Sequence, residues 1–280
     1  MVLVGCVSVG RGDGALPGPP PSTGGAPSVR PAESGRRPAE SGRGLADPAK
    51  KELAMRLVSS AENSSLEWRR QYGYVEDIGD GRGYTGGIVG FCSGTGDMTK
   101  VVERYGAARP GNVLEKYLPA LRKVRGSASH EGLGEPFVEA WRRAADTDPV
   151  FRAAQDAERD REYFDPAVRQ GKADGVGVLG QFVYFDAYVM HGVGDTRGST
   201  GFRTLRERAR QRAVLPVDGG DERAYLHAFL DVRVASMKRE PAHRDTSRVE
   251  TAQRVFLRDG NLALRTPLRW KVYGDTFLVR

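Results

Sequence analysis

Two carboxylates, Glu62 and Asp80, have surroundings that suit acid–base chemistry. Glu62 follows Met55 and Val58 at the i, i+3, i+7 spacing of one helical face, close to the end of a predicted helix. A carboxylate there is either a hydrogen-bonded structural acid or a desolvated acid that keeps its proton near neutral pH. Asp80 lies in the glycine-rich segment GDGRGYTG, where a ligand can approach the backbone closely. The alternative for Asp80 is an ordinary Asp-Gly hairpin turn.

The pair is more informative than either member. A carboxylate on a helix that faces a second one on a hairpin across a cleft is the arrangement with which glycosidases protonate a leaving oxygen and activate a water molecule. Glu62 and Asp80 therefore indicate general acid–base catalysis of glycoside hydrolysis.

A third acid, Asp186, lies in the run QFVYFDAYVM, which is too apolar to leave a charge unpaired. Arg233 and Arg248 lie on later predicted helices and are the candidate partners. Such a buried network can also influence the electrostatics of the catalytic acids. Aromatic stacking on sugars is the alternative to a core position for the tryptophans, and we expect the core for all of them: Trp68, Trp141 and Trp270.

Several other motifs are not expected to carry chemistry. The GRGYTG segment, residues 81–86, matches a dinucleotide fingerprint but lacks the helix that must follow it. The GFCSG segment around Cys92 resembles a nucleophile elbow, but the alternating strands and helices of a hydrolase fold of that type are missing. The four histidines show no metal-ligand spacing, and Cys6 and Cys92 lie too far apart to indicate a disulfide framework. We expect no metal and no cofactor.

Charge and composition limit the function classes. The chain has 280 residues, 39% of them hydrophobic, and a formal net charge of +7, which by itself would fit a nucleic-acid or anionic-surface protein. Basic residues are spread along the whole chain, however, whereas acids concentrate between Glu76 and Asp97, where Arg82 is the single basic residue. This acidic patch suits a cationic ligand, and the alternative is a solvated acidic loop.

Two regions are distinguished along the chain. Residues 1–46 are rich in Gly, Pro, Ser and Arg, with RPAESGR repeated in tandem, and are predicted to be a disordered tail. The start, MVLVGCVSVG, lacks the basic region of a signal peptide; its LVGC resembles a lipobox, which would anchor Cys6 to lipid if the true start lies upstream. Residues 47–280 are predicted to form one catalytic domain, and no run is long enough for a membrane span.

The predicted elements give an α+β, mainly α-helical fold. Asp47 and Pro48 open a helix that continues through AKKELAMRLVSSAENSSLEW, and residues 72–92 form a small antiparallel hairpin or meander. Only helices follow, the last with a capping box at Ser247 and Glu250. They span Met98–Tyr105, Val113–Val124, Glu135–Ala145, Pro149–Arg159, Val176–His191, Thr204–Arg212, Glu222–Lys238 and Ser247–Arg258. This outline is lysozyme-like.

The chain resembles the family 46 chitosanases from about Leu45 to its C-terminus. The resemblance is carried, in order, by AMRLVSSAENSSLEW, QYGYVEDIGDGRGYTGGIVGFCSGTGDM, PGNVLEKYLPAL, GSASHEGLG, DREYFDPAV, TSRV, QRVFLRDGNL and PLRWKVYGD. It implies a lysozyme-like, two-lobed fold with a substrate cleft between the lobes. The departures are the long N-terminal extension, the missing signal peptide and an arginine-rich stretch at 203–212.

The resemblance also implies roles for individual residues. Glu62 matches the general acid, Asp80 the general base, and Thr85 the hydroxyl that orients the attacking water. The network behind the acids matches Asp186, Arg233 and Arg248, and Asp97 matches a carboxylate that recognises a glucosamine amine. An N-cap for a helix that starts at Met98 is the other interpretation of Asp97. Further cleft residues are implied by position: Ser64, Tyr74, Arg82, Tyr163, His191 and Glu240.

The predicted activity is endo-acting, inverting hydrolysis of β-1,4 bonds between glucosamine units of chitosan. We expect a secreted monomer whose partner is chitosan, with no nucleic acid. Two rivals remain. One is a peptidoglycan-type glycan hydrolase on the same outline, since fold alone does not determine the substrate. The other is a non-catalytic basic module that binds polyanions, for which salt-dependent DNA affinity without release of reducing sugar would be the sign.

Overall fold

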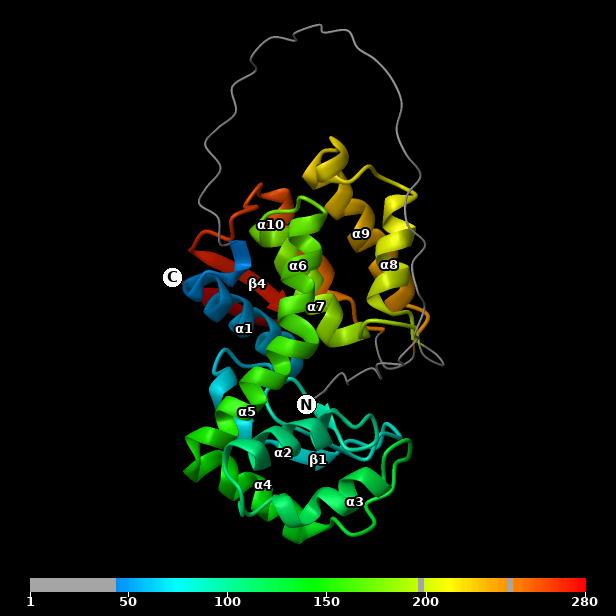
Figure 1. Cartoon of the computed structure of the whole chain (residues 1–280). Helices are drawn as coiled ribbons and strands as arrows, with labels where there is room; N and C mark the ends of the chain where they lie inside the picture. The colour runs from blue at the N-terminus through cyan, green and yellow to red at the C-terminus, as the bar shows by residue number, and fades with distance from the viewer. Residues whose placement is uncertain (1–43, 196–198, 241–243) are drawn as a thin grey trace, which may run out of the picture.

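The computed structural model describes residues 44–195, 199–240 and 244–280. The predictions for Cys6 and for most of the N-terminal tail lie outside these residues. The chain forms two lobes, one with α2 to α5 and β1 and the other with α1, α6 to α10 and β4, as Figure 1 shows. The predicted α+β, mainly helical, two-lobed architecture is confirmed.

The helices largely follow the sequence pattern. Pro149–Arg159 (α5) has the predicted bounds, while the predicted helix at 113–124 is split between a 3-10 turn and a short helix. A further helix, Asp165–Ala173 (α6), was not predicted. Further helical elements are η2 (Trp68–Gly73), α2 (Asp97–Ala108), η3 (Glu115–Tyr117), α3 (Leu118–Lys123), α4 (Glu135–Thr147), α7 (Val178–His191), α8 (Phe202–Arg210), η5 (Pro216–Asp218), α9 (Glu222–Met237) and α10 (Arg254–Arg258).

Helix α1 (Pro48–Asn63) holds the first candidate acid. The Asp47 carboxylate accepts hydrogen bonds from the Ala49 and Lys50 amides, which caps the helix as predicted. The helix ends earlier than predicted, because Ser64 adopts a left-handed conformation with φ of 49°. Gly44–Ala46 (η1), predicted to belong to the tail, is helical, and Leu45 is buried.

A three-stranded antiparallel sheet holds the second candidate acid. Its strands are Val75–Asp77 (β1), Tyr84–Gly86 (β2) and Phe91–Cys92 (β3), in the order β1-β2-β3, so the predicted meander is confirmed. Residues 78–83 join β1 to β2, which makes the connection longer than the two-residue Asp-Gly turn that was the alternative. Gly79, Gly81 and Gly83 all have positive φ in this loop, a conformation that favours glycine.

A second sheet was not predicted. Leu268–Val272 (β4) and Asp275–Val279 (β5) form an antiparallel hairpin whose two-residue turn, Tyr273 and Gly274, has positive φ at both positions. The expectation of helices alone after residue 92 was therefore wrong. The hairpin packs against α1, where the Trp270 indole donates to the Ser60 hydroxyl at 2.9 Å.

The predicted capping box is also wrong. Ser247 has helical dihedral angles and makes no side-chain cap; its hydroxyl accepts from the Tyr273 amide at 2.9 Å. Asp245 accepts from the Ser247 amide at 2.7 Å, while Glu250 pairs with Arg254. The segment that follows, Arg248–Gln253 (η7), is π-helical. The capping box does not form because the Ser247 hydroxyl is used in a contact with the β4–β5 hairpin, which was not predicted.

The lobes meet at a π-helical segment, Asp160–Phe164 (η4), between α5 and α6. Lys51 on α1 pairs with Asp160 at 2.6 Å, and Lys100 on α2 pairs with Glu162 at 2.8 Å. One short segment is thus tied to both lobes. A π-helical turn inside a longer helix is often found at a functional site.

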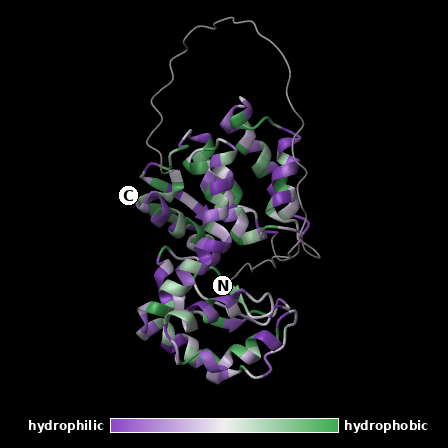
Figure 2. Ribbon diagram, viewed as in Figure 1, coloured by the Kyte–Doolittle hydropathy of each residue, from purple (hydrophilic) through white to green (hydrophobic). Residues whose placement is uncertain are grey.

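The apolar faces of the amphipathic helices form the core. Figure 2 shows hydrophobic and hydrophilic residues on most helices side by side. All three tryptophans, Trp68, Trp141 and Trp270, are buried as expected. In the described part of the chain, the helices are too short or too polar to cross a membrane.

Candidate active site

Glu62 lies near the end of α1 with its side chain only 1% exposed. Its Oε1 is 2.8 Å from Nη2 of Arg248, whose side chain is 2% exposed. A buried carboxylate is costly unless it is paired, and Arg248 supplies the compensating charge. The helix therefore presents a desolvated, arginine-bound carboxyl group.

Asp186 on α7 receives two guanidinium groups. Arg248 donates to its Oδ1 at 2.8 Å and Arg233 pairs with its Oδ2 at 2.7 Å. Gln253, which sequence reasoning missed, donates to Oδ2 at 2.7 Å. Burial raises the pKa of the Asp186 carboxyl, but the charges of the two arginines outweigh burial and hold the pKa well below its usual range. The structure thus brings together the three residues assigned to one network, and joins them to Glu62.

His191, expected in the cleft, is fully buried at the end of α7. Its Nε2 accepts a hydrogen bond from Nε of Arg233 at 3.2 Å. The imidazole therefore belongs to the surroundings of the arginine network in this structure. Contact between His191 and a substrate stays a prediction.

Asp80 lies in the 78–83 loop, and its side chain is 19% exposed. Arg82 grips both carboxylate oxygens: its amide donates to Oδ1 at 3.0 Å, and its Nε donates to Oδ2 at 2.9 Å. Tyr74 lies nearby; burial and then the neighbouring Glu76 raise the pKa of its phenol above the ordinary value, and the charge of Asp80 adds to the rise. Asp80 is therefore an oriented, accessible carboxylate, in contrast to the buried Glu62.

Thr85 is in β2 directly opposite Cys92 in β3, and both are fully buried. Their Oγ1 and Sγ atoms are 3.4 Å apart. Burial of Cys92 fits a small hydrophobic residue and not an exposed nucleophile elbow. The 81–86 glycine motif leads into β2 and a turn and is not followed by a helix, so it lacks dinucleotide-binding geometry.

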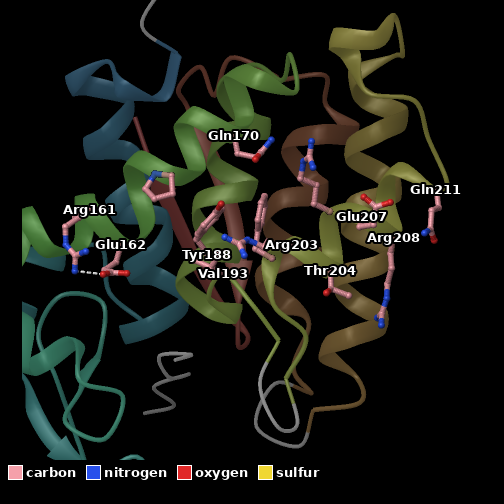
Figure 3. Close-up of a pocket in the computed structure, with 13 residues that line it drawn as sticks. Arg161, Glu162, Gln170, Tyr188, Val193, Arg203, Thr204, Glu207, Arg208 and Gln211 are labelled. Carbon is pink, nitrogen blue, oxygen red and sulfur yellow. Dashed lines mark ion pairs between the residues drawn. The ribbon is translucent and has the colours of Figure 1, made fainter. Parts of the chain in front are cut away.

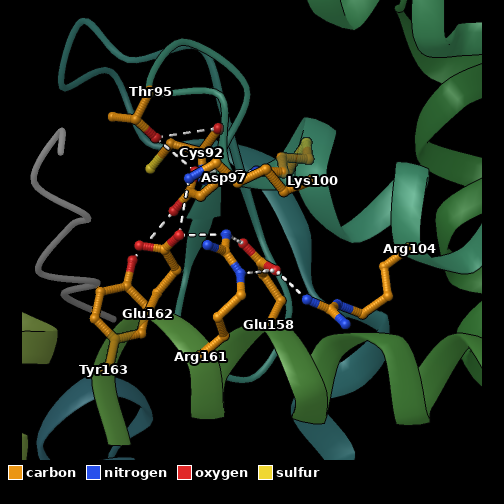
Figure 4. Close-up of polar contacts among 10 residues, drawn as sticks. Cys92, Thr95, Asp97, Lys100, Arg104, Glu158, Arg161, Glu162 and Tyr163 are labelled. Carbon is orange, nitrogen blue, oxygen red and sulfur yellow. Dashed lines mark hydrogen bonds and ion pairs between the residues drawn. The ribbon is translucent and has the colours of Figure 1, made fainter. Parts of the chain in front are cut away.

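Asp97 is the first residue of α2, and Gly96 occupies the N-cap position, so the N-cap interpretation of Asp97 was wrong. Its Oδ1 accepts from the Cys92 amide at 2.7 Å and from the Thr95 hydroxyl, and its Oδ2 accepts from the Tyr163 hydroxyl at 3.2 Å. Figure 4 shows Tyr163 reaching from η4 toward this carboxylate. The structure therefore brings together two predicted binding residues, Asp97 and Tyr163.

Ion pairs continue from this point along the lobe junction. Lys100 and Arg161 both pair with Glu162, and Arg161 and Arg104 both pair with Glu158 (Figure 4). These contacts connect α2 to α5 and η4. These ion pairs hold η4, which contains Tyr163, against α2, which begins at Asp97.

Two other predicted cleft residues lie elsewhere. Ser64 is exposed at the end of α1, two positions after Glu62. Glu240, 5% exposed, accepts from the Thr200 amide at 3.0 Å and from the Ser199 and Ser236 hydroxyls. In this structure Glu240 fastens the segment before α8 to the end of α9.

Tyr273 was not singled out from the sequence. It lies in the β4–β5 turn, and its phenol is close enough to Arg248 and Glu62 to feel both charges. Burial is the main reason that its pKa is raised to about 12. The strict alternation of apolar and polar residues in LRWKV, Leu268–Val272, is the signal that could have identified the first strand of this hairpin.

The arrangement supports acid–base chemistry by side chains. One carboxyl group is buried and arginine-bound, and the other lies on an open loop. Because their environments differ, one can act as an acid while the other acts as a base. Within residues 44–195, 199–240 and 244–280, no group of three or more His, Cys, Asp or Glu side chains could hold a metal ion.

Comparison with known proteins adds an independent result. The profile of glycosyl hydrolase family 46 matches residues 56–268. A chitosanase from Streptomyces sp. (strain N174) is 63% identical over 236 residues, which cover 84% of each chain. A chitosanase from Nocardioides sp. (strain N106) is 57% identical over the same length and coverage. The solved co-crystal structure of chitosanase OU01 with substrate superposes with a TM-score of 0.81 at 57% identity and covers 85% of this chain and 99% of the other.

Proposed function

The chain belongs to glycosyl hydrolase family 46, and we propose that it hydrolyses the β-1,4 bonds between glucosamine units of chitosan, within the polymer and with inversion at the anomeric carbon. Relatives that are 57% and 63% identical over most of this chain are chitosanases, which supports the substrate. The observation that best supports the mechanism is the contrast between the buried, arginine-bound Glu62 and the accessible Asp80.

In this mechanism Glu62 protonates the glycosidic oxygen as the bond to the leaving sugar breaks. The carboxylate that this step produces faces Arg248, 2.8 Å away, so its negative charge is stabilised as it develops. Because Arg248 also binds Asp186, its charge stays compensated when Glu62 carries a proton. Arg248 therefore keeps a carboxylate partner, Asp186, whether Glu62 is protonated or ionised.

Asp80 is the general base that takes a proton from the attacking water. Arg82 fixes both oxygens of this carboxylate, which orients it for one approach of the water. The Cys92 thiol donates to the Gly90 carbonyl at 3.4 Å, so the Thr85 proton is directed at the sulfur. The Thr85 oxygen then keeps its lone pairs to accept a hydrogen bond from the second O–H group of that water.

Asp97 is proposed to bind the amine of a glucosamine unit. The Tyr163 hydroxyl donates a hydrogen bond to the Asp97 carboxylate and so keeps it in position. We expect Asp97→Asn to lower kcat/KM on chitosan oligomers by the equivalent of about 2 to 5 kcal/mol, because one partner of a desolvated charge pair is lost. Tyr163→Phe, which keeps the carboxylate, should cost much less. Melting temperatures measured alongside separate binding from folding. Normal kinetics with reduced stability in Asp97→Asn would mean that this carboxylate only supports the start of α2.

The substrate itself is tested by reducing-sugar release from chitosan, chitin and peptidoglycan side by side. We expect rapid release from chitosan and little from the two others, because the acids between Glu76 and Asp97 favour a cationic sugar. Preferred cleavage of peptidoglycan would support the rival glycan hydrolase. We also propose that the enzyme works as a monomer outside the cell, where a polymer too large to cross a membrane is found.

A further inference from the structure

A concave surface lies on the lobe that contains α6 to α10, beside the lobe junction. Its volume is about 990 Å³, and its walls come from η4, α6, α7 and α8 (Figure 3). We call it the arginine hollow because its lining includes Arg161, Arg203, Arg206 and Arg208. Neither Glu62 nor Asp80 belongs to its lining. The acid–base mechanism leaves this surface unexplained.

The charge of the arginine hollow is opposite to that expected for a site that binds glucosamine. Its acidic lining residues are Glu162 and Glu207. Arg161 and Arg206 are already paired with carboxylates, so the excess positive charge comes from Arg203 and Arg208. Glu162 is already bound by Lys100 and Arg161, and Glu207 lies 3.6 Å from Arg210. A protonated glucosamine would be repelled here, whereas an anion would be attracted.

Helix α8 holds its arginines in a defined position. Phe202, Leu205 and Ala209 bury one face of the helix at i, i+3 and i+7. On the adjacent side, Arg206 makes two hydrogen bonds to Asp174, at 2.7 and 2.6 Å. Asp174 is 1% exposed and also accepts from the Tyr184 hydroxyl, so this anchor lies in the core. The helix is thereby fixed while its remaining arginines face solvent.

Arg203 and Arg208 are exposed and form no ion pair with any residue that the structure describes. Tyr188 lies in the same wall; burial raises the pKa of its phenol, and nearby arginine charges oppose that rise. The arginines concerned are Arg203, Arg169 and Arg206. Arg203 and Arg208 therefore leave two exposed guanidinium groups in the lining of the hollow, and each can donate hydrogen bonds to an oxyanion.

We propose that the arginine hollow binds an anionic polysaccharide, a polymer with sulfate or carboxylate groups along a sugar backbone. Its volume exceeds what a single small oxyanion needs, and Gln170, Gln211 and Thr204 add groups that hydrogen-bond to sugar hydroxyls. Single-stranded nucleic acid is less suited, since it binds by stacking bases on aromatic rings. The aromatic lining residues, Tyr188 and Phe202, are only 6% and 1% exposed.

The enzyme would then carry two sites of opposite preference. The acidic segment between Glu76 and Asp97 takes a polycation, and the arginine hollow retains the enzyme on a polyanion. Chitosan binds polyanions through its own charge, so retention on such a polymer would keep the enzyme close to its substrate. Hydrolysis of free chitosan oligomers does not depend on the hollow.

The test measures binding of the full-length enzyme to dextran sulfate at about 0.15 M ionic strength, with neutral dextran as the blank. The site variant is Arg203→Gln with Arg208→Gln. The matched control is Arg143→Gln with Arg269→Gln, which removes the same charge from exposed arginines on α4 and β4. We expect the Kd for dextran sulfate to rise on the order of tenfold in the site variant and by less than about twofold in the control.

Both variants should hydrolyse chitosan oligomers at the wild-type rate, which verifies the fold and separates this test from that of the catalytic proposal. Unchanged affinity in the site variant, or equal losses in the two variants, would overturn the inference, since net charge alone would then explain binding. A single-stranded DNA oligonucleotide that binds as tightly, through the same two arginines, would also overturn it in favour of a nucleic-acid surface.

Discussion

Glu62→Gln and Asp80→Asn should each lower turnover on chitosan by on the order of 10² or more. Glutamine preserves the size of Glu62 and can still accept a hydrogen bond from Arg248, but it has no proton of suitable acidity for the leaving oxygen. Asparagine at position 80 keeps a partner for Arg82 but cannot take the proton of the attacking water. Initial rates on chitosan oligomers, with circular dichroism for the fold, provide the measurement.

Two variants serve as matched controls for the loss of one carboxylate. Glu52→Gln changes an acid on the same helix that pairs with Arg56 and Arg69, and Asp275→Asn changes an exposed acid on β5. Both should keep near wild-type turnover. Retention of near wild-type rates in either Glu62→Gln or Asp80→Asn would remove that residue from the mechanism.

Arg248→Ala should lower the free energy of unfolding by roughly 3 to 5 kcal/mol, because it removes one partner from two buried carboxylates, Glu62 and Asp186. Chemical denaturation provides the measurement. Arg269→Ala, on the exposed face of β4, is the control and should stay within about 0.5 kcal/mol of the wild type. Activity should also fall, since Glu62 loses its counter-charge. Unchanged stability in Arg248→Ala would show that the pairs contribute nothing to the fold.

The same network gives a direction for the pH dependence of stability. The pKa of Asp186 is held below its ordinary value of about 4, so its stabilising effect is present above that pH and is lost as the pH falls through the folded-state pKa. Removal of Arg248 brings the folded-state pKa of Asp186 back toward that value or above it. The acid side of the stability profile should therefore move to higher pH in Arg248→Ala.

Local signals made much of the fold predictable. Asp47 followed by Pro48 identified the start of α1, and the bounds of α5 follow from Pro149 at its first position and the helical period after it. The glycines around Asp80 identified the meander because positive φ is demanded there. In each case a few neighbouring residues determine the structure.

Features that depend on distant contacts could not be read in the same way. Ser247 follows a capping pattern, yet its hydroxyl accepts from Tyr273, a residue in a hairpin that was itself missed. The ion pairs of η4 with α1 and α2, Lys51–Asp160 and Lys100–Glu162, join residues far apart in the chain, which no local pattern contains.

In the candidate site, too, features set by neighbouring residues could be predicted and features set by distant contacts could not. The apolar run around Asp186 was sufficient to require arginine partners, and the structure supplies Arg233 and Arg248. Position alone did not reveal that His191 and Glu240 are buried in structural contacts, or that Gln253 completes the network. Those outcomes depend on which side chains meet in three dimensions.

In the proposed mechanism Asp80 acts through a water molecule and not as a nucleophile. Inverting glycosidases hold their two carboxyl groups at least about 6.5 Å apart to accommodate this water, and we expect the same of Glu62 and Asp80. The most direct test is proton NMR of chitosan oligomers during the first minutes of digestion, before mutarotation mixes the anomers. We expect new reducing ends to appear as the α-anomer. Initial accumulation of the β-anomer, or a glycosyl group trapped on Asp80, would contradict it.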